Sequence, residues 1–180
     1  MNKSIYLTFS GIAVMLAGIA LIFSADIGIS TSKIIVPLFF IVGGFLAYLF
    51  AQANKQHPLA FPYHSAQAGG LTLFGMLIAF IPQSLSEFLD FVSYFMMAYG
   101  LIEIIYAFSA LTSNHQLKKE ILMSRFLAGF FGLIGSFILL ITNLTNESNG
   151  IILAGLLVTL GGCAFVAFSV FIKSKDKSSV

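Results

Sequence analysis

The residue best suited to chemistry in this chain is an acid that lies inside an apolar segment. Residues 99–110 read YGLIEIIYAFSA, and Glu103 is the only charged residue among them. On a helix, Tyr99 lies one turn before the acid and Tyr106 one turn after it, so both phenol side chains share its face. A carboxylic acid with hydroxyl neighbours can hold a proton, bind a cation or form a structural hydrogen bond. The segment therefore defines a candidate polar site of Glu103, Tyr99 and Tyr106.

The three histidines are the other candidate ligands, but their positions argue against a metal site. His57, His64 and His115 all fall in loops between the predicted apolar segments. A protein metal site needs three or four ligands that converge on the ion. We therefore expect solvated loop histidines, no bound metal and no cofactor.

Motifs of familiar catalytic mechanisms are missing from the sequence. It has no phosphate-binding glycine loop, no zinc-protease helix motif, and no serine–histidine or paired-aspartate arrangement in its apolar segments. We therefore expect a protein that is not an enzyme.

The composition indicates which solvent surrounds these residues. Hydrophobic residues make up 58% of the chain and charged residues 9%, with a mean hydropathy of +0.98, which is typical of an integral membrane protein. The apolar blocks are continuous and approach the roughly 20 residues that a helix needs to cross a bilayer, which favours helices over barrel strands. Six blocks are predicted, at residues 4–24, 33–53, 66–82, 87–112, 122–142 and 150–172.

The first block has an alternative interpretation as a cleaved signal peptide. The Phe-Ser-Ala at 23–25, before Asp26, resembles a cleavage site, and cleavage would leave five spans. An apolar run of about 20 residues is longer than the roughly 7–15 residues of a signal-peptide core. We therefore expect the block to remain as the first of six transmembrane helices.

The basic residues predict the orientation of these spans. With six spans, one side of the membrane holds eight of the nine lysines and arginines, and the other side holds only Lys33. The eight are Lys3, Lys55, Lys118, Lys119, Arg125, Lys173, Lys175 and Lys177. Because basic residues stay on the cytoplasmic side of short loops, both termini are expected in the cytoplasm. The net charge of +2 is then a topological signal and gives no reason to expect a nucleic-acid partner.

Glycines recur along the predicted spans at intervals of about 60 residues and indicate an internal repeat. They are Gly18, Gly75 and Gly135 in the odd-numbered spans, and Gly44, Gly100 and Gly161 in the even-numbered spans. We expect these glycines to pack helices closely. The chain is then a single domain of three parallel helical hairpins, approximately at residues 4–55, 65–113 and 121–173.

This repeat pattern resembles a known family. A threefold hairpin with a glycine midway along each odd-numbered span, and an ending such as GLIEIIYAFSA on the even-numbered ones, is similar to the HdeD-like membrane proteins of bacteria. The resemblance covers nearly the whole chain. It implies an inner-membrane location and a role in acid or envelope stress.

The pattern around Glu103 predicts which way its helix faces. Met96, Gly100 and Ala107 share the side of the acid, whereas Leu101 and Ile105 lie opposite. An ionised acid is costly in lipid, so we expect Glu103 to point into the bundle, in its protonated form, with a hydrogen bond to a tyrosine hydroxyl or a backbone carbonyl. Tyr63 is expected at the membrane interface as an anchor.

Two functions remain open from the sequence. The preferred one is a non-enzymatic inner-membrane protein of the HdeD-like type, with the lipid bilayer and either a second copy or another membrane protein as partners. The alternative is a small transporter or channel for a proton, cation or solute that uses Glu103. Apart from Glu103, the predicted spans offer scattered Ser and Thr and no buried Lys, Arg or His. Because a transport pathway needs several polar groups in register, this disfavours the alternative without excluding it.

Overall fold

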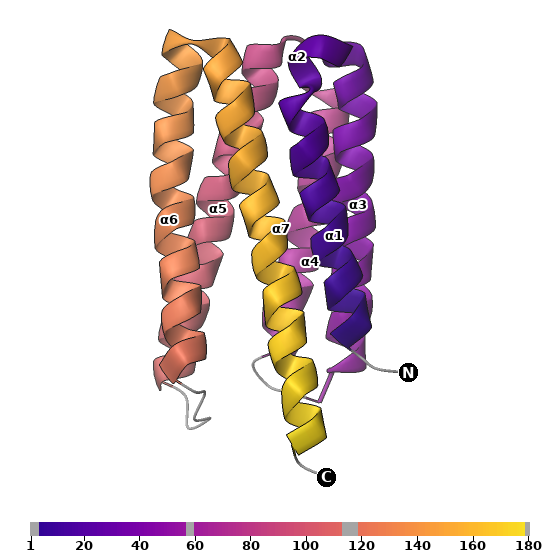
Figure 1. Ribbon diagram of the computed structural model, residues 1–180, viewed down its shortest axis with the longest axis vertical. Coiled ribbons are helices and arrows are strands. Elements are labelled where there is room, and N and C mark those ends of the chain that lie inside the picture. Colours follow the sequence, from indigo (N-terminus) through magenta and orange to yellow (C-terminus); the bar gives the residue numbers. More distant parts are fainter. Residues whose placement is uncertain (1–3, 57–59, 113–118, 179–180) are drawn as a thin grey trace.

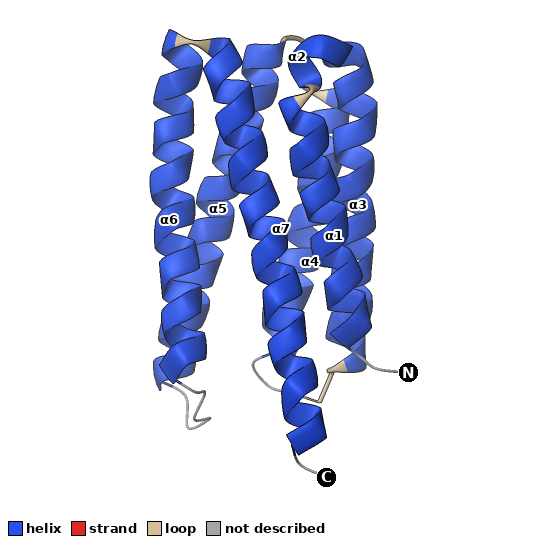
Figure 2. Cartoon of the chain, in the orientation of Figure 1, coloured by secondary structure: helices blue, strands red, loops and turns tan. Residues whose placement is uncertain are grey.

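The chain forms a bundle of helices. The computed structural model describes residues 4–56, 60–112 and 119–178. All seven elements in these ranges are α-helices, and the ranges contain no strand (Figure 2). The elements are α1 (Ser4–Ile22), α2 (Ser24–Ile27), α3 (Ile29–Ala53), α4 (Ala60–Phe80), α5 (Leu85–Thr112), α6 (Lys119–Thr145) and α7 (Glu147–Ser178). The predicted all-α class is therefore confirmed.

The long helices run side by side along the longest axis of the molecule, and successive long helices run in opposite directions (Figure 1). α1 begins, α5 ends and α7 ends at the lower end of this view. α2 and the turn between α6 and α7 lie at the upper end. Segments far apart in the sequence, such as α1 and α7, are direct neighbours.

The turns at the upper end have local stop and start signals. Gly28 between α2 and α3 has a φ of 77°, a conformation that other residues rarely adopt, and the described residues contain no other positive φ. At the start of α5, the backbone N–H of Glu87 donates to the hydroxyl of Ser84, and the Glu87 carboxylate accepts from the N–H of Gln83. This reciprocal arrangement is close to a capping box and satisfies amide donors at the helix start.

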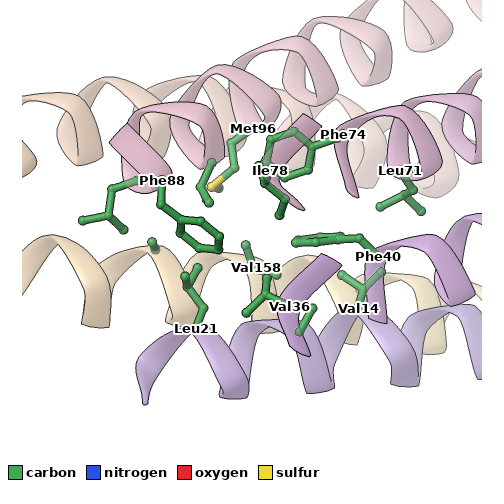
Figure 3. Close-up of a cluster of buried hydrophobic side chains, with 14 of the residues drawn as sticks. Val14, Leu21, Val36, Phe40, Leu71, Phe74, Ile78, Phe88, Met96 and Val158 are labelled. Atoms are coloured by element: carbon green, nitrogen blue, oxygen red, sulfur yellow. The ribbon is translucent and has the colours of Figure 1, made fainter. Parts of the chain in front are cut away.

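The centre of the bundle is an apolar core. Phe40 of α3 and Phe88 of α5 are fully buried, and Leu71 and Phe74 of α4 and Val158 of α7 join the same cluster (Figure 3). The ring of Phe40 meets that of Phe74 edge to face at 5.3 Å between centroids. The core therefore joins helices from all parts of the chain.

The closest helix pairs are α1 with α7, α3 with α4, and α5 with α6. At each of these contacts a glycine brings the two backbones together. A Cβ added to Gly11 of α1 would lie 2.8 Å from the carbonyl oxygen of Gly162 in α7, and one added to Gly44 of α3 would lie 2.9 Å from that of Ala68 in α4. Small residues thus allow close packing where lipid supplies no hydrophobic force between helices.

Five helices are long and apolar enough to span a membrane. They are Ser4–Ile22, Ile29–Ala53, Leu85–Thr112, Arg125–Leu144 and Ser148–Val170. Large apolar side chains such as Ile34, Phe45 and Ile105 face outward from them, which suits contact with lipid. The protein is therefore a membrane protein. α4, which covers residues 66–80 of the predicted third span at 66–82, is not among the five.

Candidate functional site

α5 directs Glu103 into the bundle. Glu103 is 2% exposed, and the buried residues Met96, Gly100 and Ala107 lie on the same helical face. Leu101 is exposed on the opposite side. The orientation predicted from the spacing of polar and small residues agrees with this arrangement.

Glu103 forms an ion pair with Arg125 of α6. The guanidinium Nη1 lies 3.0 Å from Oε2 of the carboxylate and 3.3 Å from Oε1. The hydroxyl of Tyr99 donates to Oε1 at 2.6 Å, and the hydroxyl of Tyr63 from α4 donates to the same oxygen. The carboxylate is therefore held by three donors from three helices.

Three aromatic rings surround the guanidinium of Arg125. Its Cζ lies 4.3 Å from the ring centroid of Tyr63, 4.8 Å from that of Tyr106 and 4.2 Å from that of Phe168. Such ring faces attract a cation, and the attraction is stronger away from water. Arg125 thus connects its own helix, α6, with α4, α5 and α7.

A close approach between α5 and α6 positions the ion pair. A Cβ on Gly100 would lie 2.7 Å from the carbonyl oxygen of Gly129, and a Cβ on Gly129 would lie 2.7 Å from that of Gly100. Glu103 follows Gly100 by three residues and Arg125 precedes Gly129 by four, so each charged side chain lies one turn from the contact. The two glycines therefore bring the two charges within reach.

A cavity of about 210 Å³ lies beside the ion pair. Its polar wall consists of His64 and Gln67 of α4, Tyr99 and Glu103 of α5, and Arg125 of α6. Its apolar wall consists of Leu7 of α1, Ala128 of α6, and Ala164, Phe165, Ala167 and Phe168 of α7. The cavity is therefore mostly apolar, with hydrogen-bonding groups from three helices.

Two polar features of the residues that line the cavity bear on what it could bind. Nε of Arg125 is buried and has no hydrogen-bond partner among the described residues. Nδ1 of His64 lies 2.8 Å from Oε1 of Gln67, so the histidine donates to the amide oxygen if that nitrogen carries its proton. The amide nitrogen of Gln67 is then a second donor in the wall.

The structure brings the predicted site residues together, although in different roles. Tyr99 bonds to Glu103 through its hydroxyl, whereas Tyr106 contacts Arg125 through its ring. The expectation that Glu103 has no charged partner is wrong, because Arg125 is 7% exposed and paired with it. Its position one turn from Gly129 in the glycine-rich face of α6 was the signal that could have indicated this.

Two further expectations about α4 are wrong. His64 is not in a solvated loop but buried in the helix, with 3% of its surface exposed. Tyr63 is 5% exposed and bonds to Glu103, so it is not an interfacial anchor.

The other two histidines, His57 and His115, lie outside the described residues. Within the described ranges there is no group of three or more potential metal ligands.

The six predicted packing glycines differ in their surroundings. Added Cβ atoms on Gly18, Gly44, Gly75 and Gly100 would meet the backbone of a neighbouring helix. At Gly135 the neighbour is the side chain of Leu157, at 3.1 Å. At Gly161 nothing lies within 4 Å, and it is the adjacent Gly162 that approaches the α1 backbone at Gly11.

Three comparisons with known proteins identified no relative of this chain. A scan against protein-family models, a search of curated proteins and a search of solved structures each found no match.

Proposed function

We propose that the chain is a non-enzymatic inner-membrane protein that crosses the bilayer six times, with α4 as its third span in addition to the five apolar helices. At about 1.5 Å per residue, its 21 residues reach roughly 30 Å, the thickness of the hydrocarbon layer. The polar residues that lower its mean hydropathy, His64 and Gln67, are buried against the other helices and do not require lipid contact. Six spans also agree with α1 beginning and α7 ending at the same end of the bundle (Figure 1). From the basic residues, we assign that end to the cytoplasm.

The proposed architecture is three parallel hairpin repeats around the cavity. Gly11 contacts Gly162, Ala68 contacts Gly44, and Gly129 contacts Gly100, so the same kind of approach recurs at three helix pairs. The residues four positions before the first member of each pair are Leu7, His64 and Arg125. All three line the cavity. This recurrence supports a pseudo-threefold axis near the cavity, where the three repeats meet.

For the biological role, we propose an HdeD-like contribution to acid or envelope stress. The observation that carries a role for the site is the Glu103–Arg125 pair, a buried charge pair in a membrane bundle. Charged residues inside membrane spans are costly and commonly mark functional positions. The proposed task of the pair is to hold α4, α5 and α6 together so that the bundle remains assembled under stress.

Survival of a strain that lacks the gene tests this role. After a shift to acidic medium, wild-type protein is expected to restore survival, and Arg125→Gln at equal membrane abundance is expected to restore less. Glu87→Gln, which changes an exposed acid at the opposite end of the bundle, serves as the matched control. Equal survival with and without the gene, under acid and under envelope stress, would contradict the proposed role.

A second candidate function is the handling of a small solute. The cavity of about 210 Å³ favours it, because the cavity adjoins both members of the ion pair. In many transporters the binding site also lies where the repeats meet.

A further inference from the structure

The cavity beside the ion pair offers the side chain of Arg125, apolar walls and room for a few carbon atoms. We propose that it binds a short-chain monocarboxylic acid, whose carboxylate pairs with Arg125 while its proton is held by Glu103. This inference deepens the solute-handling function and rests on it. The stress role and the six-span architecture do not depend on it.

The guanidinium of Arg125, which lines the cavity, selects the chemical class of the ligand. Both hydrogen bonds to Glu103 leave from Nη1 of Arg125, and the buried Nε has no partner among the described residues. A buried donor without an acceptor is unfavourable. The planar fork of N–H donors in a guanidinium fits two carboxylate oxygens at once. The amide nitrogen of Gln67, in the same wall, is a further donor for the ligand.

The size and walls of the cavity set the length of the ligand. An apolar protein cavity of about 150 Å³ can hold benzene. At about 210 Å³, this cavity has room for a molecule of similar or somewhat larger size, such as a monocarboxylic acid with on the order of four to six carbon atoms and two oxygens. The apolar wall, which includes Leu7, Phe165 and Phe168, suits an alkyl chain.

Charge balance requires that a proton enters with the carboxylate. Glu103 and Arg125 together are neutral, so an added anion would leave an uncompensated negative charge in a buried site. If the undissociated acid enters, its O–H proton passes to a carboxylate oxygen of Glu103. The ligand carboxylate then takes over from Glu103 as the negative charge that balances the guanidinium. The O–H bond of the ligand breaks, an O–H bond forms on Glu103, and the total charge is unchanged.

Among the described residues that face this site, Glu103 is the carboxylic acid, and so it is the group that we expect to take up the proton of the ligand. The other titratable groups are Arg125 of α6, Tyr63 and His64 of α4, and Tyr99 and Tyr106 of α5. The cavity-lining residues of α1 and α7 are apolar. Tyr63 and Tyr99 donate to Oε1 of Glu103 and can continue to do so when the acid is protonated.

Calorimetric titration of butyrate into the protein in lipid nanodiscs tests the proposal, with empty nanodiscs and butyramide as controls. Between about pH 6 and pH 8, the dissociation constant of wild type is expected to rise about tenfold per pH unit, because one proton is bound with each butyrate. Glu103→Gln cannot take the proton, so its affinity for butyrate should be independent of pH. His64→Gln, which removes the other nearby proton acceptor, should keep the wild-type slope.

A third variant tests the contribution of Arg125 to ligand binding. The double substitution Glu103→Gln with Arg125→Gln removes both charges and should weaken butyrate binding by about 10- to 100-fold relative to Glu103→Gln, because the charged donor is lost. If Glu103→Gln folds poorly, the pH slope of wild type and its preference for butyrate over butyramide decide the matter. No butyrate binding by folded wild type, binding without a pH slope, or equal binding of butyramide would overturn the proposal. If butyrate does not bind but the reporter fusions report six spans, or the gene restores acid survival, then the ligand proposal fails and the proposed membrane role does not.

Discussion

Nη1 of Arg125 lies 3.0 Å from Oε2 of Glu103, although the two residues belong to different helices. The guanidinium also lies against rings from α4, α5 and α7. Removing one member of a buried pair leaves an uncompensated charge, which costs more than the net attraction of the pair suggests. The pair is therefore a point at which small chemical changes should have measurable effects on the whole bundle.

The tyrosines around Glu103 are expected to contribute unequally. Tyr63→Phe and Tyr99→Phe each remove one hydroxyl that donates to the carboxylate, and each should lower the free energy of unfolding by about 0.5–2 kcal/mol. Tyr106→Phe keeps the ring that contacts Arg125 and is the matched control, with little expected change. The measurement is the free energy of unfolding of the three variants and of wild type in detergent micelles. A loss for Tyr106→Phe as large as for the other two would contradict these roles.

Two glycine substitutions should separate close helix packing from open space. Gly129→Ala places a Cβ 2.7 Å from the backbone oxygen of Gly100, so it should destabilise the bundle by about 1–3 kcal/mol. Gly161→Ala meets nothing within 4 Å and should leave stability unchanged or slightly higher. Thermal stability of the purified proteins checks both. The assignment of the α5–α6 contact fails if Gly129→Ala is as stable as wild type.

Reporter fusions test the proposed orientation. Fusions at Val180 and after Lys55 should report the cytoplasm, whereas fusions after Ser30 and Glu147 should report the opposite side. The physical reason is the retention of basic residues on the cytoplasmic side. An external signal at Val180, with a cytoplasmic signal after Lys55, would rule out six spans.

The helical class and the direction of Glu103 could be predicted because both depend on local patterns. Apolar composition indicates a membrane protein, and the spacing of Met96, Gly100 and Ala107 identifies the face of α5 that is buried. The choice between a tyrosine hydroxyl and a backbone carbonyl as the partner of Glu103 required the three-dimensional structure, which places two tyrosine hydroxyls there.

The ion pair could not be predicted by the same reasoning, because it depends on which helices are neighbours. Arg125 counted as a basic residue near a loop, and His64 counted as a solvated loop histidine. In the structure, the contact of Gly129 with Gly100 brings Arg125 next to Glu103. The polar residues His64 and Gln67 of α4 are buried beside this pair. A sequence-based estimate of lipid contact cannot distinguish a polar residue that faces water from one that faces another polar residue inside the bundle.

A double-mutant cycle measures whether Glu103 and Arg125 form a buried pair that joins α5 and α6. The measured quantity is the free energy of unfolding in detergent micelles for wild type, Glu103→Gln, Arg125→Gln and the double variant. Each single substitution leaves one buried charge and should cost about 3–5 kcal/mol, whereas the double variant leaves none and should cost less than the sum by at least about 1 kcal/mol. Costs that add to within about 0.5 kcal/mol would show that the two residues do not interact and that the pair does not join the helices.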